Sequence, residues 1–218
     1  MVGRSRLNHG SIHRVPYRPT DRTRARLAAA RETIVEAAMA QLAEGGYAST
    51  SVAGVARRAG VATGSVYRHF PSKADLLAEV FRRCSQAEVD VLRGMAERGE
   101  PVADRLAAWV EAFARRALAE PVRAYALIAE PVDPAVDAER LVFRRAYADL
   151  FATTLREGVE RGELDPHDPE LVAAAIVGAL AEALVGPLAR RETDADALVA
   201  GLQTFVLSAV RSHANAAQ

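Results

Sequence analysis

Apolar side chains recur every three or four positions along most of the chain, which is the spacing of one face of an α-helix. Between Arg24 and Glu44, for example, Leu27, Ile34 and Leu42 belong to such a face. No convincing run alternates apolar and polar residues as a half-buried strand would, and alanine and leucine, two strong helix formers, are abundant. The pattern therefore predicts an all-α protein of about nine helices.

Turn-forming residues divide this pattern into its expected helices. Gly45 and Gly46 should end the first helix, because glycine readily takes the left-handed conformation of a helix C-terminus. Pro71 is expected to stop the preceding helix, and Ser72 to cap the next one, with Asp75 completing a capping box. Proline- and glycine-containing turns, Gly186-Pro187 among them, separate the later helices, which are expected at residues 102–119, 122–130, 135–161, 168–186 and 193–213.

The stretch Tyr47–Lys73 has the pattern of two short helices joined by a tight turn. Thr50 or Ser51 caps the first short helix, residues 59–61 form the turn, and the second helix covers about 62–70. Such a helix-turn-helix places the N-terminal part of its second helix against the major groove of DNA. The residues that this helix should expose are Thr63, Gly64, Ser65 and Arg68.

The charge is distributed unevenly, although the formal net charge is zero. Residues 1–83 carry 14 basic and 6 acidic side chains, whereas residues 84–218 carry 14 basic and 22 acidic ones. A basic N-terminal part favours polyanion binding there. Residues 1–22 are expected to form a flexible arginine-rich arm, which either enters a minor groove or raises affinity non-specifically as a solvated tail.

Residues 31–77 resemble the DNA-binding domain of the TetR family of bacterial transcription regulators. Many residue types match in one register without a gap. They are Ile34, Ala37, Ala38, Leu42, Gly46-Tyr47, Thr50-Ser51-Val52, Ala56, Ala59-Gly60-Val61, Gly64, Val66-Tyr67-Arg68-His69-Phe70, Ser72-Lys73 and Leu76-Leu77. The chain length and the helical remainder also resemble the family.

The resemblance implies a set of DNA contacts. Base contacts are implied for Thr63, Ser65 and Arg68, and backbone contacts for the side chains of Ser51, Tyr67, His69 and Lys73. The expected DNA-binding set is completed by Thr50 and Gly64. Lys73 is the only lysine beside 27 arginines, which supports a specific role for it. Ala62 departs from the usual Ser or Thr of the family, so the second motif helix should lack a side-chain cap.

The C-terminal part should hold a dimer surface. Small residues, among them Gly178 and Ala183, occupy much of the helix at 168–186, and apolar residues such as Leu202 and Phe205 line the helix at 193–213. Two helices from each subunit would form a four-helix bundle, and the resemblance implies the same surface. Packing within one chain is the alternative explanation.

Aromatic residues gather in the middle of the chain and are candidates for an effector-binding cavity. They are Trp109, Phe113, Tyr125, Phe143, Tyr147 and Phe151. Charged residues nearby could orient a ligand, namely Arg116, Glu130, Arg144 and Asp149. Packing of these aromatic residues in a plain hydrophobic core is the alternative.

We therefore expect a basic arm at 1–22, a helix-turn-helix domain at 23–71 and an effector-binding and dimerisation domain at 72–218. The expected function is that of a homodimeric repressor, released from a palindromic DNA operator by an unidentified small molecule. A DNA-binding regulator or adaptor without an effector, or a small helical enzyme, are the alternatives. No catalytic or metal site and no cofactor is expected. A membrane span is not expected either, because Glu182 and Pro187 interrupt the most apolar stretch, and the single Cys84 fits a cytoplasmic protein.

Overall fold

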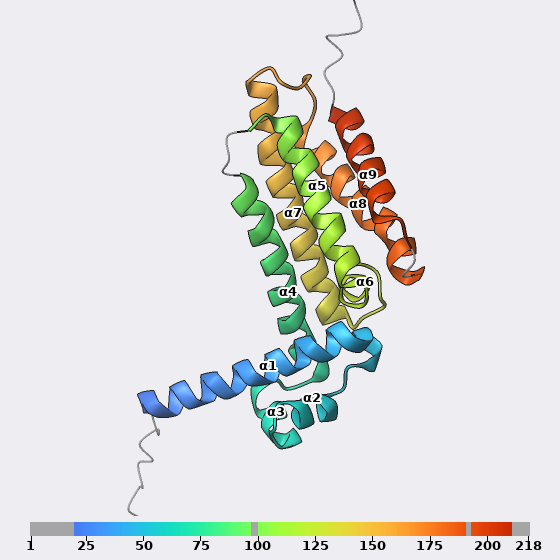
Figure 1. Ribbon diagram of the computed structural model, residues 1–218. Helices are drawn as coiled ribbons and strands as arrows, with labels where there is room; N and C mark the ends of the chain where they lie inside the picture. Colours follow the sequence, from blue (N-terminus) through green and yellow to red (C-terminus); the bar gives the residue numbers. More distant parts are fainter. Residues whose placement is uncertain (1–19, 97–99, 191–192, 211–218) are drawn as a thin grey trace, which may run out of the picture.

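The computed structural model describes residues 20–96, 100–190 and 193–210, which form nine α-helices and no strand (Figure 1). The expected all-α architecture is therefore confirmed. Residues 1–19 of the arm expected at 1–22 lie outside the described residues, and the expected end of the arm was wrong, because Asp21 and Arg22 already belong to the first helix. The helices are α1 (Asp21–Ser49), α2 (Val52–Arg58), α3 (Thr63–His69), α4 (Lys73–Ala96), α5 (Val102–Ala119), α6 (Pro121–Ile128), α7 (Pro134–Glu160), α8 (Pro169–Arg190) and α9 (Ala195–Val210).

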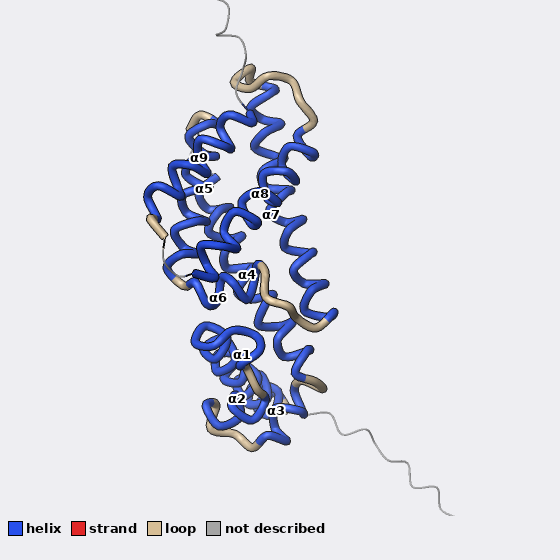
Figure 2. The backbone as a smooth tube through the Cα atoms, turned by 90° about the vertical axis from the view of Figure 1, so that its right-hand side faces the viewer, coloured by secondary structure: helices blue, strands red, loops and turns tan. Residues whose placement is uncertain are grey.

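The molecule has a small head, formed by α1, α2, α3 and the start of α4, below an elongated helical body (Figures 1 and 2). The first turns of α1 extend sideways beyond the body, and α8 and α9 lie together on one side of it. Helix α4 leaves the head and continues into the body, where it packs along α7. Helix α3, the second helix of the helix-turn-helix, thus lies at the end of the molecule that is far from α9 (Figure 1).

Each part has its own hydrophobic core, and the head core includes residues from the body. Ile34, Leu42, Val55 and Val66 are buried together in the head with apolar side chains at the start of α4. Ala126 of α6 and Val136 of α7 belong to the same cluster. The core of the head therefore extends beyond the expected boundary at residue 71.

The backbone around the short helices follows the expected capping chemistry. Gly46 has a φ of 74°, which interrupts the helical conformation of α1 before its last turn. The Ser51 hydroxyl accepts a hydrogen bond from the Gly54 N–H at 3.1 Å and so caps α2. At the start of α3, Ala62 provides no side-chain cap, as expected. Ser72 and Asp75 bond to one another at the start of α4.

The expected end of the eighth helix at residue 186 was wrong. Helix α8 continues through Pro187 to Arg190. Leu184 and Leu188, on either side of the proline, are both buried in the core of the body. This packing keeps the last turn helical although proline removes one backbone hydrogen bond.

Helix α8 is long and apolar enough to cross a membrane by length and composition alone. A core helix of a soluble protein meets the same criterion, so the finding does not assign a membrane span. Only 28% of its most apolar window is buried inside the chain, and an apolar face of α8 therefore lies uncovered. Leu171 is 67% exposed at its start.

Candidate DNA-binding surface and body cavity

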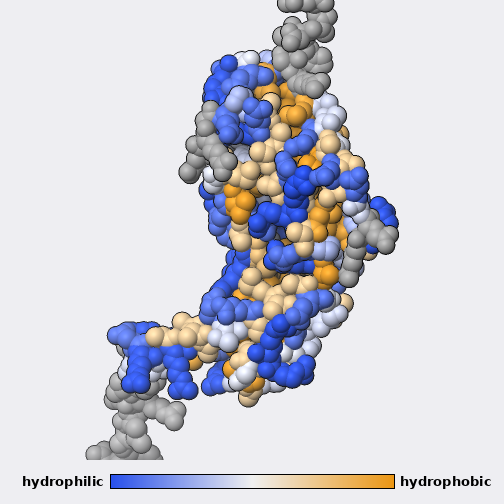
Figure 3. Space-filling view, viewed as in Figure 1, coloured by the Kyte–Doolittle hydropathy of each residue, from blue (hydrophilic) through white to orange (hydrophobic). Residues whose placement is uncertain are grey.

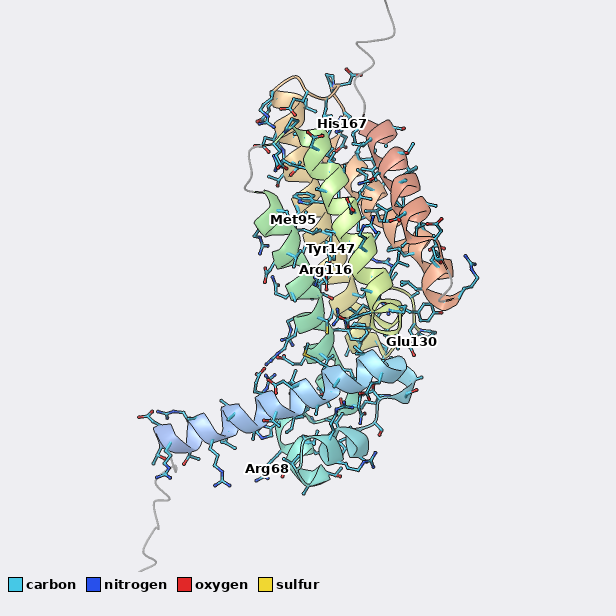
Figure 4. All side chains as sticks on the ribbon, viewed as in Figure 1. Arg68, Met95, Arg116, Glu130, Tyr147 and His167 are labelled. Atoms are coloured by element: carbon cyan, nitrogen blue, oxygen red, sulfur yellow. The ribbon has the colours of Figure 1, made fainter. Side chains whose placement is uncertain are left out.

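Helix α3 is attached to the head by one face and is open on the other. Val66 is buried in the head core, and Phe70, which ends the helix, is buried beside it. Thr63, Gly64, Tyr67 and Arg68 are exposed, whereas Ser65 and His69 are partly buried. Figure 4 shows Arg68 at the outer end of the head, away from the body. The exposed face of α3 therefore carries most of the side chains that were expected to reach DNA.

Two details of this face fit contact with another molecule. The Arg68 guanidinium donates to the Ser65 hydroxyl at 3.0 Å, which holds both side chains on the outer surface of the helix. A Cβ atom at Gly64 would meet nothing within 4 Å, so packing within the chain does not require glycine there. Glycine in an exposed helix weakens it, and close approach of a partner to the backbone is one reason to keep it.

The two hydroxyl residues before α2, Thr50 and Ser51, differ in burial and in hydrogen bonding. Ser51 is exposed at the N-terminus of α2, where its backbone N–H also bonds to Gln41. Thr50 is only 2% exposed, and its hydroxyl donates to the carbonyl of Gly46 at 2.7 Å. This placement favours a structural role for Thr50 over the DNA contact that was expected of it.

Lys73 begins α4 beside the end of α1. Its Nζ atom donates to the Tyr47 carbonyl at 3.1 Å and lies 4.6 Å from the centre of the Tyr47 ring. The ammonium group is thus held in place by a hydrogen bond and a cation–π contact. It stands at the N-terminus of a helix, where the backbone N–H groups also favour an anion.

Tyr47 also connects the head to the body. Its phenol donates to the Asp133 carboxylate, and its backbone N–H donates to Glu130 at 2.8 Å. Burial, together with the bond to Asp133, raises the pKa of Tyr47 to about 12, so the phenol is a donor at neutral pH. Glu130, one of the charged residues that could have oriented a ligand, does not line the cavity, and its carboxylate bonds to backbone N–H groups of the head instead.

A buried carboxylate joins α1 to α4 on another face of the head. Glu79 is 6% exposed and accepts hydrogen bonds from Arg31 of α1 and from Arg82 and Arg83 of α4. The bond from Arg31 and those from the other two guanidinium groups outweigh the effect of burial and lower the pKa of Glu79 to about 2. Glu79 therefore stays ionised and connects α4 to Arg31 of α1.

The body contains a cavity of about 100 Å³ between α4, α5, α6, α7 and α8. Of the expected aromatic residues, Phe113, Phe143, Tyr147 and Phe151 line it. The other two do not line it. Trp109 is buried in the core, where its ring lies edge-on to that of Phe151 with 5.1 Å between the ring centres. Tyr125 is partly buried and packs against the same core.

Charged side chains surround the apolar lining of the cavity. Arg116 bonds to Glu88 through two nitrogens, at 2.6 and 2.9 Å, and Figure 4 shows Arg116 close to Tyr147. Arg144 also lines the cavity and, among the described residues, forms no ion pair or side-chain hydrogen bond. Burial, reinforced by the negative charge of Glu88, raises the pKa of Tyr147, which keeps its phenol neutral. Asp149, which was also expected to help orient a ligand, is exposed and does not line the cavity.

An uncovered face runs along α8 and α9. On α8 the exposed residues are mostly small, among them Ala174, Ala175, Gly178 and Ala183. On α9, Phe205 is 50% exposed, whereas Leu202, which was expected on the same surface, is buried in the core of the body. Figure 3 shows apolar surface on the side of the body where these helices lie. The described residues contain no cluster of three or more His, Cys, Asp or Glu side chains arranged to hold a metal ion.

Comparison with known proteins agrees with this architecture. Residues 34–80 match the model of the bacterial regulatory proteins of the tetR family, and residues 99–184 match that of the tetracyclin repressor-like C-terminal domain. The HTH-type transcriptional repressor KstR of Mycobacterium tuberculosis is 45% identical over 53 residues, which is 24% of each chain. The fatty acid metabolism regulator protein of Bacillus subtilis is 41% identical over 49 residues, 22% of this chain and 25% of the relative. The matches thus span about a quarter of the length of these curated relatives.

Solved structures extend the similarity to the whole body. The fatty acid degradation regulator FadR from Bacillus halodurans has a TM-score of 0.70 at 25% identity, covering 83% of this chain and 99% of that one. FadR from Bacillus subtilis in complex with stearoyl-CoA has a TM-score of 0.72 at 21% identity, with the same coverage. RolR in complex with resorcinol has a TM-score of 0.68 at 20% identity, covering 88% of this chain and 92% of that one. The two family models and the shared fold show that the chain belongs to the TetR family of bacterial regulatory proteins.

Proposed function

We propose that this protein is a cytoplasmic, homodimeric transcriptional repressor that leaves a palindromic DNA operator when a small molecule enters its body cavity. The observation that carries the proposal is the open face of α3, which presents polar side chains on a rigid, basic head. The membership in a family of regulatory proteins supports it. The similarity to repressors such as KstR supports repression in particular.

The side chains on α3 and at the starts of α2 and α4 have separate roles in this proposal. Thr63, Ser65 and Arg68 read base edges in the major groove, and Arg68 has the geometry to bond a guanine through two nitrogens. The side chains of Ser51, Tyr67, His69 and Lys73 contact phosphates and set the position of the helix on the duplex. Gly64 has no side chain, so the backbone of α3 can approach the duplex closely there. Packing within the chain does not require glycine at this position.

The uncovered face of α8 and α9 is the proposed dimer surface. Its small exposed residues let two helices from each subunit pack closely around a two-fold axis. Burial of exposed Leu171 and Phe205 against the partner supplies apolar contact area. Two copies of α3 would then enter successive major grooves, which lie roughly 34–36 Å apart.

The cavity is the proposed effector site. Its apolar lining and arginine-containing edge fit a molecule with an apolar part and an anionic or polar group. The similar folds that hold stearoyl-CoA in one relative and resorcinol in another support ligand binding by this body. A regulator without an effector would be expected to have a solidly packed body, which the cavity argues against. The ligand acts by binding one arrangement of the dimer better than the other.

DNA-binding measurements test the proposal. A palindrome selected from random duplexes should bind at least about 10³-fold more tightly than random DNA, with a strong dependence on salt. Arg68→Ala should relax the preference at one base pair, whereas Lys73→Ala should weaken binding to all sequences and flatten the salt dependence. Arg145→Ala, an exposed arginine of the body, is the matched control and should change neither. A monomer that binds no duplex at low salt would refute the proposal.

A further inference from the structure

Arg140 is the point at which the cavity meets the end of α6. This arginine of α7 lines the cavity, and its side chain is 13% exposed. Its Nε atom donates to the Leu127 carbonyl at 2.9 Å, and Nη2 donates to the carbonyls of Ala126 at 3.1 Å and Glu130 at 2.8 Å. The last carbonyls of a helix have no partners within that helix, so one guanidinium here holds the C-terminal end of α6 together.

Glu130 is bound from two sides. Arg140 holds its backbone carbonyl from the cavity side. On the head side, its carboxylate accepts hydrogen bonds from the backbone N–H groups of Tyr47 at 2.8 Å and Ala48 at 3.0 Å. A Cβ atom on Gly46 would lie 2.7 Å from Oε2 of Glu130, so the carboxylate reaches the head only because that residue is glycine. Cavity and head are thus connected through one residue.

The connection continues to the DNA-binding surface. Tyr47, whose N–H is held by Glu130, offers its carbonyl and ring to Lys73. Lys73 in turn is the side chain proposed above to contact phosphate. From the cavity to this anchor, every step is a direct contact between Arg140, Glu130, Tyr47 and Lys73.

We propose that Arg140 and Glu130 are positioning residues through which the cavity sets the orientation of the head. The proposal rests on the effector function proposed for the cavity. A ligand whose anionic or carbonyl group accepts hydrogen bonds from Arg140 withdraws them from the end of α6. Glu130 then loses its fixed position, and the two heads of the dimer lose the orientation that a palindrome requires. The change in head orientation is the two-state element that the ligand biases.

The other arginines at the cavity are differently placed, which provides a matched control. Arg116 bonds to the carboxylate of Glu88, and Arg123, which lies on α6 itself, pairs with Glu120 and Glu88. No described hydrogen bond joins either guanidinium to the carbonyls at the end of α6. Arg144 is one turn beyond Arg140 on α7 and lines the same cavity, but no described hydrogen bond joins it to α6. Arg144→Gln therefore removes the same charge from the same cavity and leaves the connection intact.

Hydrogen exchange in the full-length protein tests the connection without a ligand. Arg140→Gln and Glu130→Ala should each raise the exchange rates of the Tyr47 and Ala48 amides at least about tenfold. Arg144→Gln should leave them within about twofold, and Arg140→Lys, which keeps the charge and part of the bonding, should fall between. Urea unfolding of each variant confirms that it is folded. Unchanged exchange at both amides in Arg140→Gln, beside raised exchange in Glu130→Ala, would overturn the proposal.

DNA binding separates an effect on orientation from local damage to the head. Arg140→Gln should weaken binding to the full palindrome about tenfold and binding to a single half-site less than twofold. The double variant Arg140→Gln/Glu130→Ala should bind the full palindrome as tightly as whichever single variant binds it less tightly. The two losses should not add, because both changes break the same connection. Equal losses on full site and half-site, or no loss on either, would contradict the inference. Failure of the unmodified protein to bind any duplex would instead refute the proposed function, and the exchange result would still stand.

Discussion

The buried carboxylate of Glu79 offers a quantitative test of how the head is attached to α4. Its pKa of about 2, against 4.5 for a free glutamate side chain, corresponds to roughly 3 kcal/mol of folding free energy at neutral pH. The folded pKa is the lower one, so this stability is present above pH 5 and is lost as the pH falls toward 2. Glu79→Gln should therefore destabilise the protein by about 2–3 kcal/mol at pH 7 and by only about 1 kcal/mol at pH 3.

Urea unfolding followed by circular dichroism, at one protein concentration and several pH values, measures this difference. All other acidic groups are common to both proteins, so the difference between them isolates Glu79. Glu44→Gln is the control, because Glu44 also pairs with an arginine, Arg58, but is exposed to solvent. That change should have little effect at any pH. A difference for Glu79→Gln that stays constant between pH 7 and pH 3 would refute the electrostatic explanation.

Three further predictions concern single positions. Gly46→Ala should destabilise the fold by about 1–2 kcal/mol in urea unfolding, because its φ is 74° and the new methyl group would contact Glu130; a change below about 0.5 kcal/mol would contradict this. Thr50→Val should lower the free energy of unfolding by about 1 kcal/mol, because the hydrogen bond to the Gly46 carbonyl is lost. The DNA affinity of the folded protein should not change. A tenfold weaker affinity would instead identify Thr50 as a DNA contact. Gly178→Trp should give a monomer in light scattering, because the site is open in one subunit but lies on the proposed dimer face. Gly94→Trp, equally open on α4, should remain a dimer.

The fold was predictable because its helices depend on local signals. Helical periodicity, Gly46 at the kink and Ser51 at the cap are visible in the sequence, and the structure confirms them. The end of α8 was not predictable from the same signals. Gly186-Pro187 looks like a turn, but the burial of Leu188 in the body core keeps the helix going. Tertiary packing outweighs a local preference there.

The candidate sites likewise contain parts that local sequence patterns predict and parts that depend on tertiary packing. The exposed side of α3 follows from the motif, since Val66 and Phe70 must face inward and the intervening residues outward. The contacts around Glu130 join residues more than 80 positions apart, and no local pattern indicates such a pair. Trp109 and Tyr125 are aromatic like the residues that line the cavity, but in the packed helices their side chains pack against the core of the body. Composition identifies the aromatic layer, and only the packed structure selects its cavity-lining members.

The shared core of the head has a consequence for engineering. Ala126 and Val136 of the body complete the cluster that also holds Ile34 and Leu42. A fragment cut after the helix-turn-helix would expose these apolar contacts to water. Chimeric regulators that exchange sequence specificity should therefore transplant the start of α4 as well, and keep small apolar residues at 126 and 136 of the recipient. Hybrids that keep these contacts should be expressed in a well-folded form, whereas hybrids joined at residue 71 should aggregate.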